Sequence, residues 1–163
     1  MRPATRRKLR FAAAFAVYFT ALWALWDTPL VYPLKVFVVL LHELSHAAVA
    51  VATGGSIERI VLDPAQGGAC YCPDGNAFLT LSAGYLGSLA WGGVLLTAAQ
   101  SRRLDARWVT ALVGAAVVVL TALYVRNAFG LAFGLAFGGA LLLAARRLPG
   151  HVNQVLVTVL GLT

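Results

Sequence analysis

The sequence predicts an all-α polytopic membrane protein with about five transmembrane helices, a partial sixth helix, and a short β-hairpin-like loop after the second helix. Hydrophobic residues make up 60% of the 163 residues, charged residues only 12%, and the mean hydropathy is +0.80. Soluble globular proteins rarely reach these values. The chain also divides into apolar runs close to the ~20 residues that a helix needs to cross the hydrocarbon core.

These apolar runs give the order of the expected spans. The first run, residues 11–26, follows a basic tail at residues 1–10 and ends in bulky side chains, whereas a cleaved signal peptide needs small ones, so we expect an uncleaved span. The second run starts near Pro33 and ends at Gly54-Gly55, a typical helix terminator. Three more spans follow at 78–99, 108–125 and 127–145, and then a stretch too short to span alone at 152–162.

The segment between the second and third spans is the only one with strand character. Ile57 to Leu62 is followed by turn residues at 63–68, and then by Ala69 to Cys72. This pattern predicts a short hairpin, with a plain connecting loop as the alternative. The open edge of such a hairpin can pair with an extended peptide by strand addition.

The second span contains the clearest chemical signal of the chain, His42-Glu43-Leu44-Ser45-His46. Residues four apart share one helix face, so both imidazoles can reach one tetrahedral Zn²⁺ while Glu43 addresses the metal-bound water. Ionisable groups at bilayer depth are costly unless they serve a function. The pattern therefore indicates a metal-dependent hydrolase with His42 and His46 as zinc ligands and Glu43 as the general base.

Two cysteines flank Tyr71 in the hairpin segment. Cys70 and Cys72 could supply soft zinc ligands, but no second pair completes a zinc knuckle. Cysteines one residue apart also do not easily form a disulfide with each other. We interpret both as ordinary loop residues, with metal binding as the alternative.

Small residues recur every four positions in the third and fifth spans, which predicts close helix packing and no chemistry. These residues are Gly84, Ser88 and Gly92 in the third span, and Gly130, Gly134 and Gly138 in the fifth. Asn127, between the fourth and fifth spans, has two interpretations. It either caps a helix at the interface or donates to a substrate backbone or a ligand carboxylate.

In this membrane setting the chain resembles the site-2 protease family of intramembrane zinc metallopeptidases, in particular the compact branch without a PDZ domain. The resemblance covers roughly Val36 to Trp91, and the later spans agree only in hydropathy. It rests on His42–Ala47, Thr53-Gly54-Gly55, the Gly67-Gly68 loop and Ala83–Ser88. The resemblance implies that His42 and His46 hold zinc and that Glu43 activates the water that attacks a peptide bond within the bilayer.

The resemblance also implies a third zinc ligand, which the family supplies as an Asp from a later membrane segment. Nothing acidic follows Asp105 in this sequence. The compact branch carries an Asp-containing stretch just after its last apolar helix, so we expect residues 11–163 to be a single, C-terminally truncated membrane-embedded domain. In a complete chain, His151, Asn127 or Asp63 would have to substitute, and loss of catalysis would become the better expectation.

Charge and hydropathy limit the partners and the location. The net charge of +7 comes from basic residues at the ends of apolar segments, where they anchor to lipid headgroups, so we expect a lipid bilayer and no nucleic acid. Basic residues divide almost evenly between the two sides of the membrane. The dense basic tail at residues 1–10 favours a cytoplasmic N-terminus, in a multi-pass protein of the cell membrane.

Three classes of function compete. The first is an intramembrane zinc endopeptidase that cuts a membrane-anchored protein, and it is our prediction. The second is a catalytically inactive relative that acts as a membrane-protein scaffold or chaperone, which the missing third ligand favours. The third is a metal transporter or sensor, for which Glu43 has no special use. Neither the substrate nor the oligomeric state can be predicted from the sequence.

Overall fold

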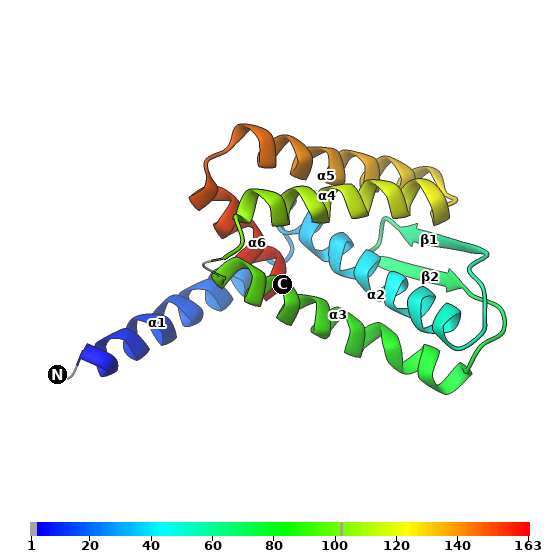
Figure 1. The fold of residues 1–163 in the computed structure, drawn as a ribbon, viewed down its shortest axis with the longest axis horizontal. Coiled ribbons are helices and arrows are strands. Elements are labelled where there is room, and N and C mark those ends of the chain that lie inside the picture. The colour runs from blue at the N-terminus through cyan, green and yellow to red at the C-terminus, as the bar shows by residue number, and fades with distance from the viewer. Residues whose placement is uncertain (1–2, 102) are drawn as a thin grey trace. The chain divides into compact units, whose positions relative to one another are not determined.

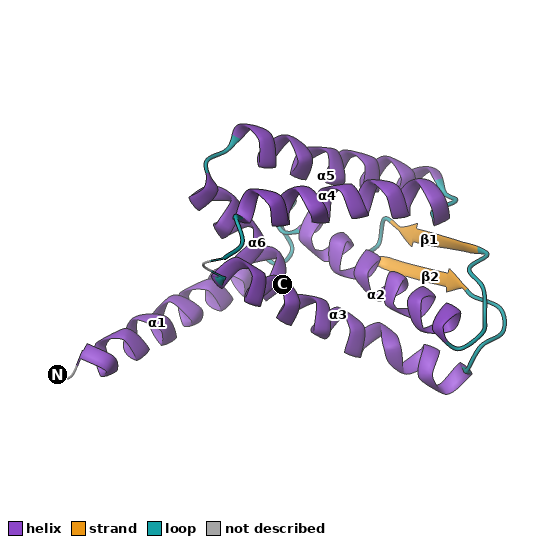
Figure 2. Cartoon of the chain, in the orientation of Figure 1, coloured by secondary structure: helices purple, strands orange, loops and turns teal. Residues whose placement is uncertain are grey.

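The computed structural model of the chain describes residues 3–101 and 103–163, without the side chains of residues 3–8, 10, 11 and 14. Six α-helices and one two-stranded sheet follow one another in these ranges (Figures 1 and 2). They are α1 (Pro3–Ala24), α2 (Tyr32–Ala52), β1 (Arg59–Asp63), β2 (Gly67–Tyr71), α3 (Ala77–Gln100), α4 (Ala106–Tyr124), α5 (Ala128–Arg147) and α6 (Gly150–Leu162). The predicted fold class, with a hairpin after the second helix, is confirmed.

Four of the described helices, α2 to α5, are long and apolar enough to cross a membrane. Shorter apolar stretches lie at residues 15–24 of α1 and in α6. The chain is therefore a multi-pass membrane protein. Helix α1 starts at Pro3, so the described part of the basic segment is helical and continuous with the apolar residues that follow it.

The chain divides into two compact units, residues 1–33 and residues 34–163. The first unit contains α1 and the turn after it. The second contains nearly all of α2, the hairpin and α3 to α6. All the residues predicted to act chemically belong to the second unit.

Helix ends in the second unit have clear local causes. Helix α2 stops before Gly54, whose φ of +93° is left-handed and favours glycine, and Gly55 N–H donates to the Ala50 carbonyl at 2.8 Å. Asn76 caps α3 by accepting the Leu79 N–H at 3.0 Å. Asp105 caps α4 in the same way, accepting the Arg107 N–H at 2.9 Å.

Glycines bring the later helices close together. Helices α4 and α5 lie side by side (Figure 1), and a Cβ on Gly138 would lie 2.9 Å from the Gly114 carbonyl oxygen. Helix α6 packs on α3, where a Cβ on Gly92 would lie 2.9 Å from the Gly161 carbonyl oxygen. The packing predicted for Gly92 and Gly138 is what these contacts show.

The hairpin is held from one side by the turn between α4 and α5. Strands β1 and β2 are antiparallel, with Ile60 opposite Cys70 and Leu62 opposite Gly68. Ile60 also forms a parallel bridge with Val125, and the Arg126 N–H donates to the Ile60 carbonyl at 3.0 Å. One edge of the sheet is thus occupied, which leaves β2 with the open edge.

Candidate metal centre

The two histidines of the second span lie one turn apart on α2. Their ring centroids are 4.6 Å apart and the rings meet edge to face at 82°. Both rings are half-buried, while Glu43 is only 5% exposed. Helix periodicity places His42 and His46 on one face, as the four-residue spacing predicts.

Gly84 of α3 creates the space in front of both imidazoles. A Cβ at this position would lie closer than 3.0 Å to Nε2 of His42 and also to Nε2 of His46. The two Nε2 atoms therefore converge on one point beside the Gly84 backbone. This arrangement fits two nitrogen ligands of one metal ion, with the room that the ion needs supplied by the missing side chain.

The orientation of His46 is fixed by a backbone group. Its Nδ1 lies 2.6 Å from the Thr80 carbonyl oxygen. A carbonyl can only accept, so Nδ1 carries the proton and Nε2 keeps its free lone pair. Hydrogen bonds of this kind commonly orient histidines that bind metals.

Strand β2 lies against the carboxylate of Glu43. A Cβ on Gly68 would be 2.7 Å from Oε1 of Glu43, so only glycine allows this approach. The backbone of Cys70 hydrogen-bonds to the same carboxylate. Glu43 therefore sits between the imidazoles of its own helix and the open edge of the sheet.

The contacts between β1 and the turn that joins α4 to α5 determine which way the backbone groups of β2 point. The Asn127 side chain accepts the Leu62 N–H at 3.1 Å and donates to the Leu62 carbonyl at 2.7 Å. Leu62 and Ile60 therefore point their backbone groups away from β2. In an antiparallel ladder, the residues opposite them, Gly68 and Cys70, then point theirs outward as well. Within the described residues, the open edge beside Glu43 thus presents backbone groups that no strand pairs, and one of them, the Cys70 N–H, binds the Glu43 carboxylate.

Comparison with known families agrees with this geometry. A family model described as Peptidase M50B-like matches residues 15–163. The chain belongs to the Peptidase M50B-like family. This is the site-2 protease family, so the resemblance based on the sequence is confirmed. No curated protein and no solved structure matches the chain significantly.

A third protein ligand is not found in the described part of this M50B-like chain. Residues 3–101 and 103–163 contain no group of three or more His, Cys, Asp or Glu side chains that could hold a metal ion. Asp63 instead accepts the Ala65 N–H at 2.7 Å in the hairpin turn, and the amide of Asn127 is engaged with Leu62. His151 lies in the first turn of α6 and joins no such group.

The cysteines of the M50B-like chain differ from the sequence interpretation. Cys70 and Cys72 are paired as a disulfide, although only Tyr71 separates them. Cys70 lies in β2 and Cys72 directly follows the strand, with their Cα atoms 5.6 Å apart. Neither cysteine joins the two histidines in a metal-binding group within the described residues.

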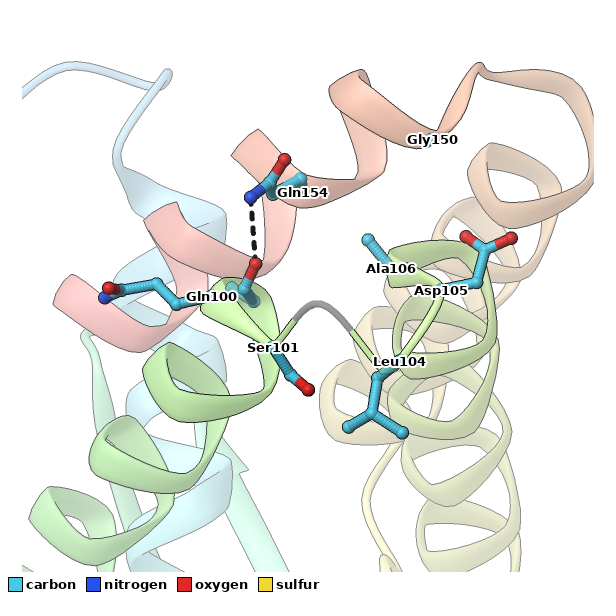
Figure 3. Close-up of a pocket in the computed structure, with 8 residues that line it drawn as sticks. Gln100, Ser101, Leu104, Asp105, Ala106, Gly150 and Gln154 are labelled. Carbon is cyan, nitrogen blue, oxygen red and sulfur yellow. Dashed lines mark hydrogen bonds between the residues drawn. The ribbon is translucent and has the colours of Figure 1, made fainter.

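A polar pocket of about 430 Å³ lies elsewhere, where α3, α4 and α6 meet (Figure 3). Gln154 of α6 donates to the Ala99 carbonyl at 3.0 Å at its rim, which ties α6 to the end of α3. Gln100, which lines it, follows Gly84 by 16 residues, or about 24 Å of helix. This pocket is therefore separate from the histidines.

Sequence reasoning missed two features of the site. The small-residue spacing predicts only helix packing for Gly84, whereas its backbone borders both imidazoles. Asn127 occupies the N-cap position of α5 but makes no side-chain cap bond, and binds Leu62 instead. The role of Gly84 could be suspected from the sequence, because Gly84-Tyr85 lies within Ala83–Ser88, one of the segments that carry the family resemblance. The role of Asn127 could not, because it depends on a contact between residues 65 positions apart, which no local sequence pattern predicts.

Proposed function

We propose that this chain is an intramembrane zinc-dependent endopeptidase that hydrolyses peptide bonds of membrane-anchored proteins in the cell membrane. The observation that carries the proposal is the convergence of Nε2 of His42 and Nε2 of His46 on the space beside Gly84. Glu43 follows the first histidine and lies beside an open strand edge. Membership of a membrane peptidase family supports the same chemistry.

His42 and His46 are the residues that would hold the zinc ion. A bound zinc ion supplies a Lewis acid that polarises the carbonyl and lowers the pKa of its water. Thr80 keeps the proton on Nδ1 of His46, and Gly84 keeps the space before both Nε2 atoms open. The helix thus prepares two of the ligand positions before any metal arrives.

Glu43 acts as the general base and then as the general acid. It takes a proton from the attacking water and delivers it to the leaving amine, so the carboxylate is restored at the end of the cycle. An extended substrate segment pairs with the outward backbone groups of Gly68 and with the Cys70 carbonyl on β2, because the Cys70 N–H already donates to Glu43. That pairing lays the scissile bond along the edge that Glu43 already touches.

Glu43→Gln tests the proposal. The purified protein in lipid nanodiscs is given a single-span model substrate, and both the cleavage rate and the zinc content are measured. We expect cleavage to fall by about 10²–10⁴-fold, the usual contribution of a general base, while the zinc content is unchanged. Glu58→Gln, at the only other glutamate of the chain, is the matched control and should cleave normally.

A second candidate function is a catalytically inactive relative that holds membrane proteins as a scaffold. One observation favours it, namely that no third His, Cys, Asp or Glu ligand accompanies the histidines in the described residues. The same experiment separates the two functions. A scaffold would show no cleavage in the wild type and would retain its partners equally well in Glu43→Gln.

A further inference from the structure

Tyr85 stands next to the candidate metal centre and has no role in the steps above. It follows Gly84 on α3, and its ring meets the His42 ring edge to face, with centroids 4.7 Å apart and an interplanar angle of 82°. The side chain is 82% exposed. The phenol is therefore held beside an imidazole of the site while it remains open to an incoming molecule.

The position of this tyrosine along α3 is unusual for its chemistry. Tyr85 lies eight residues after Ala77, about 12 Å into the helix, whereas membrane tyrosines concentrate near the two interfaces. Its hydroxyl donates no hydrogen bond to any residue that the structure describes. Within the described residues the hydroxyl is therefore available to donate to an incoming molecule.

Two other polar groups around the site are already engaged, whereas the Thr80 hydroxyl oxygen is buried without a hydrogen-bond partner. Nδ1 of His46 donates to the Thr80 carbonyl, and the Asn127 amide binds Leu62. An ionised Glu43 can only accept hydrogen bonds. Tyr85 differs from Thr80 because its hydroxyl belongs to an exposed side chain beside His42, where an incoming molecule can reach it.

We propose that Tyr85 is a further catalytic residue, which donates a hydrogen bond to the oxyanion formed during peptide hydrolysis. The inference rests on the proposed function. As the water oxygen bonds to the carbonyl carbon, the carbonyl π pair moves to the oxygen, and the Tyr85 hydroxyl stabilises the negative charge there. Tyr85 keeps its proton throughout, because Glu43 carries the proton from the water to the leaving nitrogen.

Tyr85→Phe is the direct test, because it keeps the ring against His42 and removes only the hydroxyl. We expect kcat to fall by about 10²–10³-fold, the usual effect of losing one oxyanion donor, with KM and zinc content close to those of the wild type. Tyr124→Phe is the matched control. Tyr124 lines an apolar cavity between α2, α3 and α4, and its variant should cleave normally.

A binding measurement gives a second readout that does not depend on turnover. A phosphonamidate peptide imitates the tetrahedral oxyanion, while the uncleaved substrate bound to the Glu43→Gln background represents the ground state. Tyr85→Phe should weaken binding of the phosphonamidate by roughly the factor lost in kcat and leave substrate binding unchanged. Equal losses for both ligands would mean that the hydroxyl acts in ground-state binding, and would overturn the proposal.

The outcomes also separate this inference from the proposed function. A wild-type protein that cleaves, together with a Tyr85→Phe variant that cleaves equally fast, overturns the role of Tyr85 alone. A wild-type protein that neither binds zinc nor cleaves overturns both. Loss of zinc in Tyr85→Phe would mean that the residue serves the fold of the metal centre, and would also overturn the oxyanion role.

Discussion

At the scale of single residues, the candidate site depends on two glycines as much as on its charged groups. Gly84 leaves the space before both imidazoles, and Gly68 lets strand β2 approach the Glu43 carboxylate. A side chain at either position would meet atoms of the functional groups themselves. The spacing of His42 and His46 could be predicted from the sequence, because helix geometry is local. The glycine contacts could not, because they join separate elements.

Gly84→Ala tests the contribution of the space beside the histidines. The added methyl group would lie closer than 3.0 Å to both Nε2 atoms, so we expect zinc affinity to fall by about 10–100-fold or more. The measurement is a competition titration with a chromogenic zinc chelator. Gly93→Ala, on the same helix, is the control because a Cβ there meets nothing within 4 Å. Equal zinc affinity in the two variants would contradict the placement of the metal.

At the scale of elements, the hairpin is part of the site because the turn between α4 and α5 fixes it there. The hairpin itself could be predicted from its strand and turn residues, and its turn forms within the expected segment. Its attachment could not be predicted. The Asn127 side chain forms two hydrogen bonds with Leu62, which lies in a strand far away in the sequence. These two bonds take the place of those that a neighbouring strand would form with Leu62.

Asn127→Ala tests this attachment. Removing the amide leaves the Leu62 N–H and carbonyl without partners, which costs about 1–3 kcal/mol for each buried group. We expect faster hydrogen exchange in residues 59–71, measured by mass spectrometry, and a raised KM for peptide cleavage. Both follow because the strand that receives the substrate is less firmly held.

Asn153→Ala is the matched control for this experiment. Asn153 is fully buried and also binds backbone carbonyls with its side-chain amide, at the turn between α5 and α6. Its replacement should lower thermal stability without increasing exchange in the hairpin. If both variants loosened residues 59–71 equally, Asn127 would have a general role in the fold and no specific role at the site.

At the scale of the whole molecule, hydropathy alone determines most of the fold. Four long apolar helices and a multi-pass arrangement follow from composition and run length, since a bilayer accepts little else. The family also follows from the sequence, because its most specific motif is contained in one helix. The completeness of the metal centre does not follow. Ligands from other elements depend on how the helices meet, and the described residues bring only His42 and His46 together.

The zinc content of the purified protein shows whether His42 and His46 hold a metal ion. Elemental analysis of the wild type and His46→Ala in detergent, each before and after treatment with a strong zinc chelator, gives the metal stoichiometry. We predict one zinc ion per wild-type chain, removed by the chelator and missing from His46→Ala, because two converging imidazoles hold it. A wild-type protein without zinc, or zinc that persists in His46→Ala, would contradict this prediction.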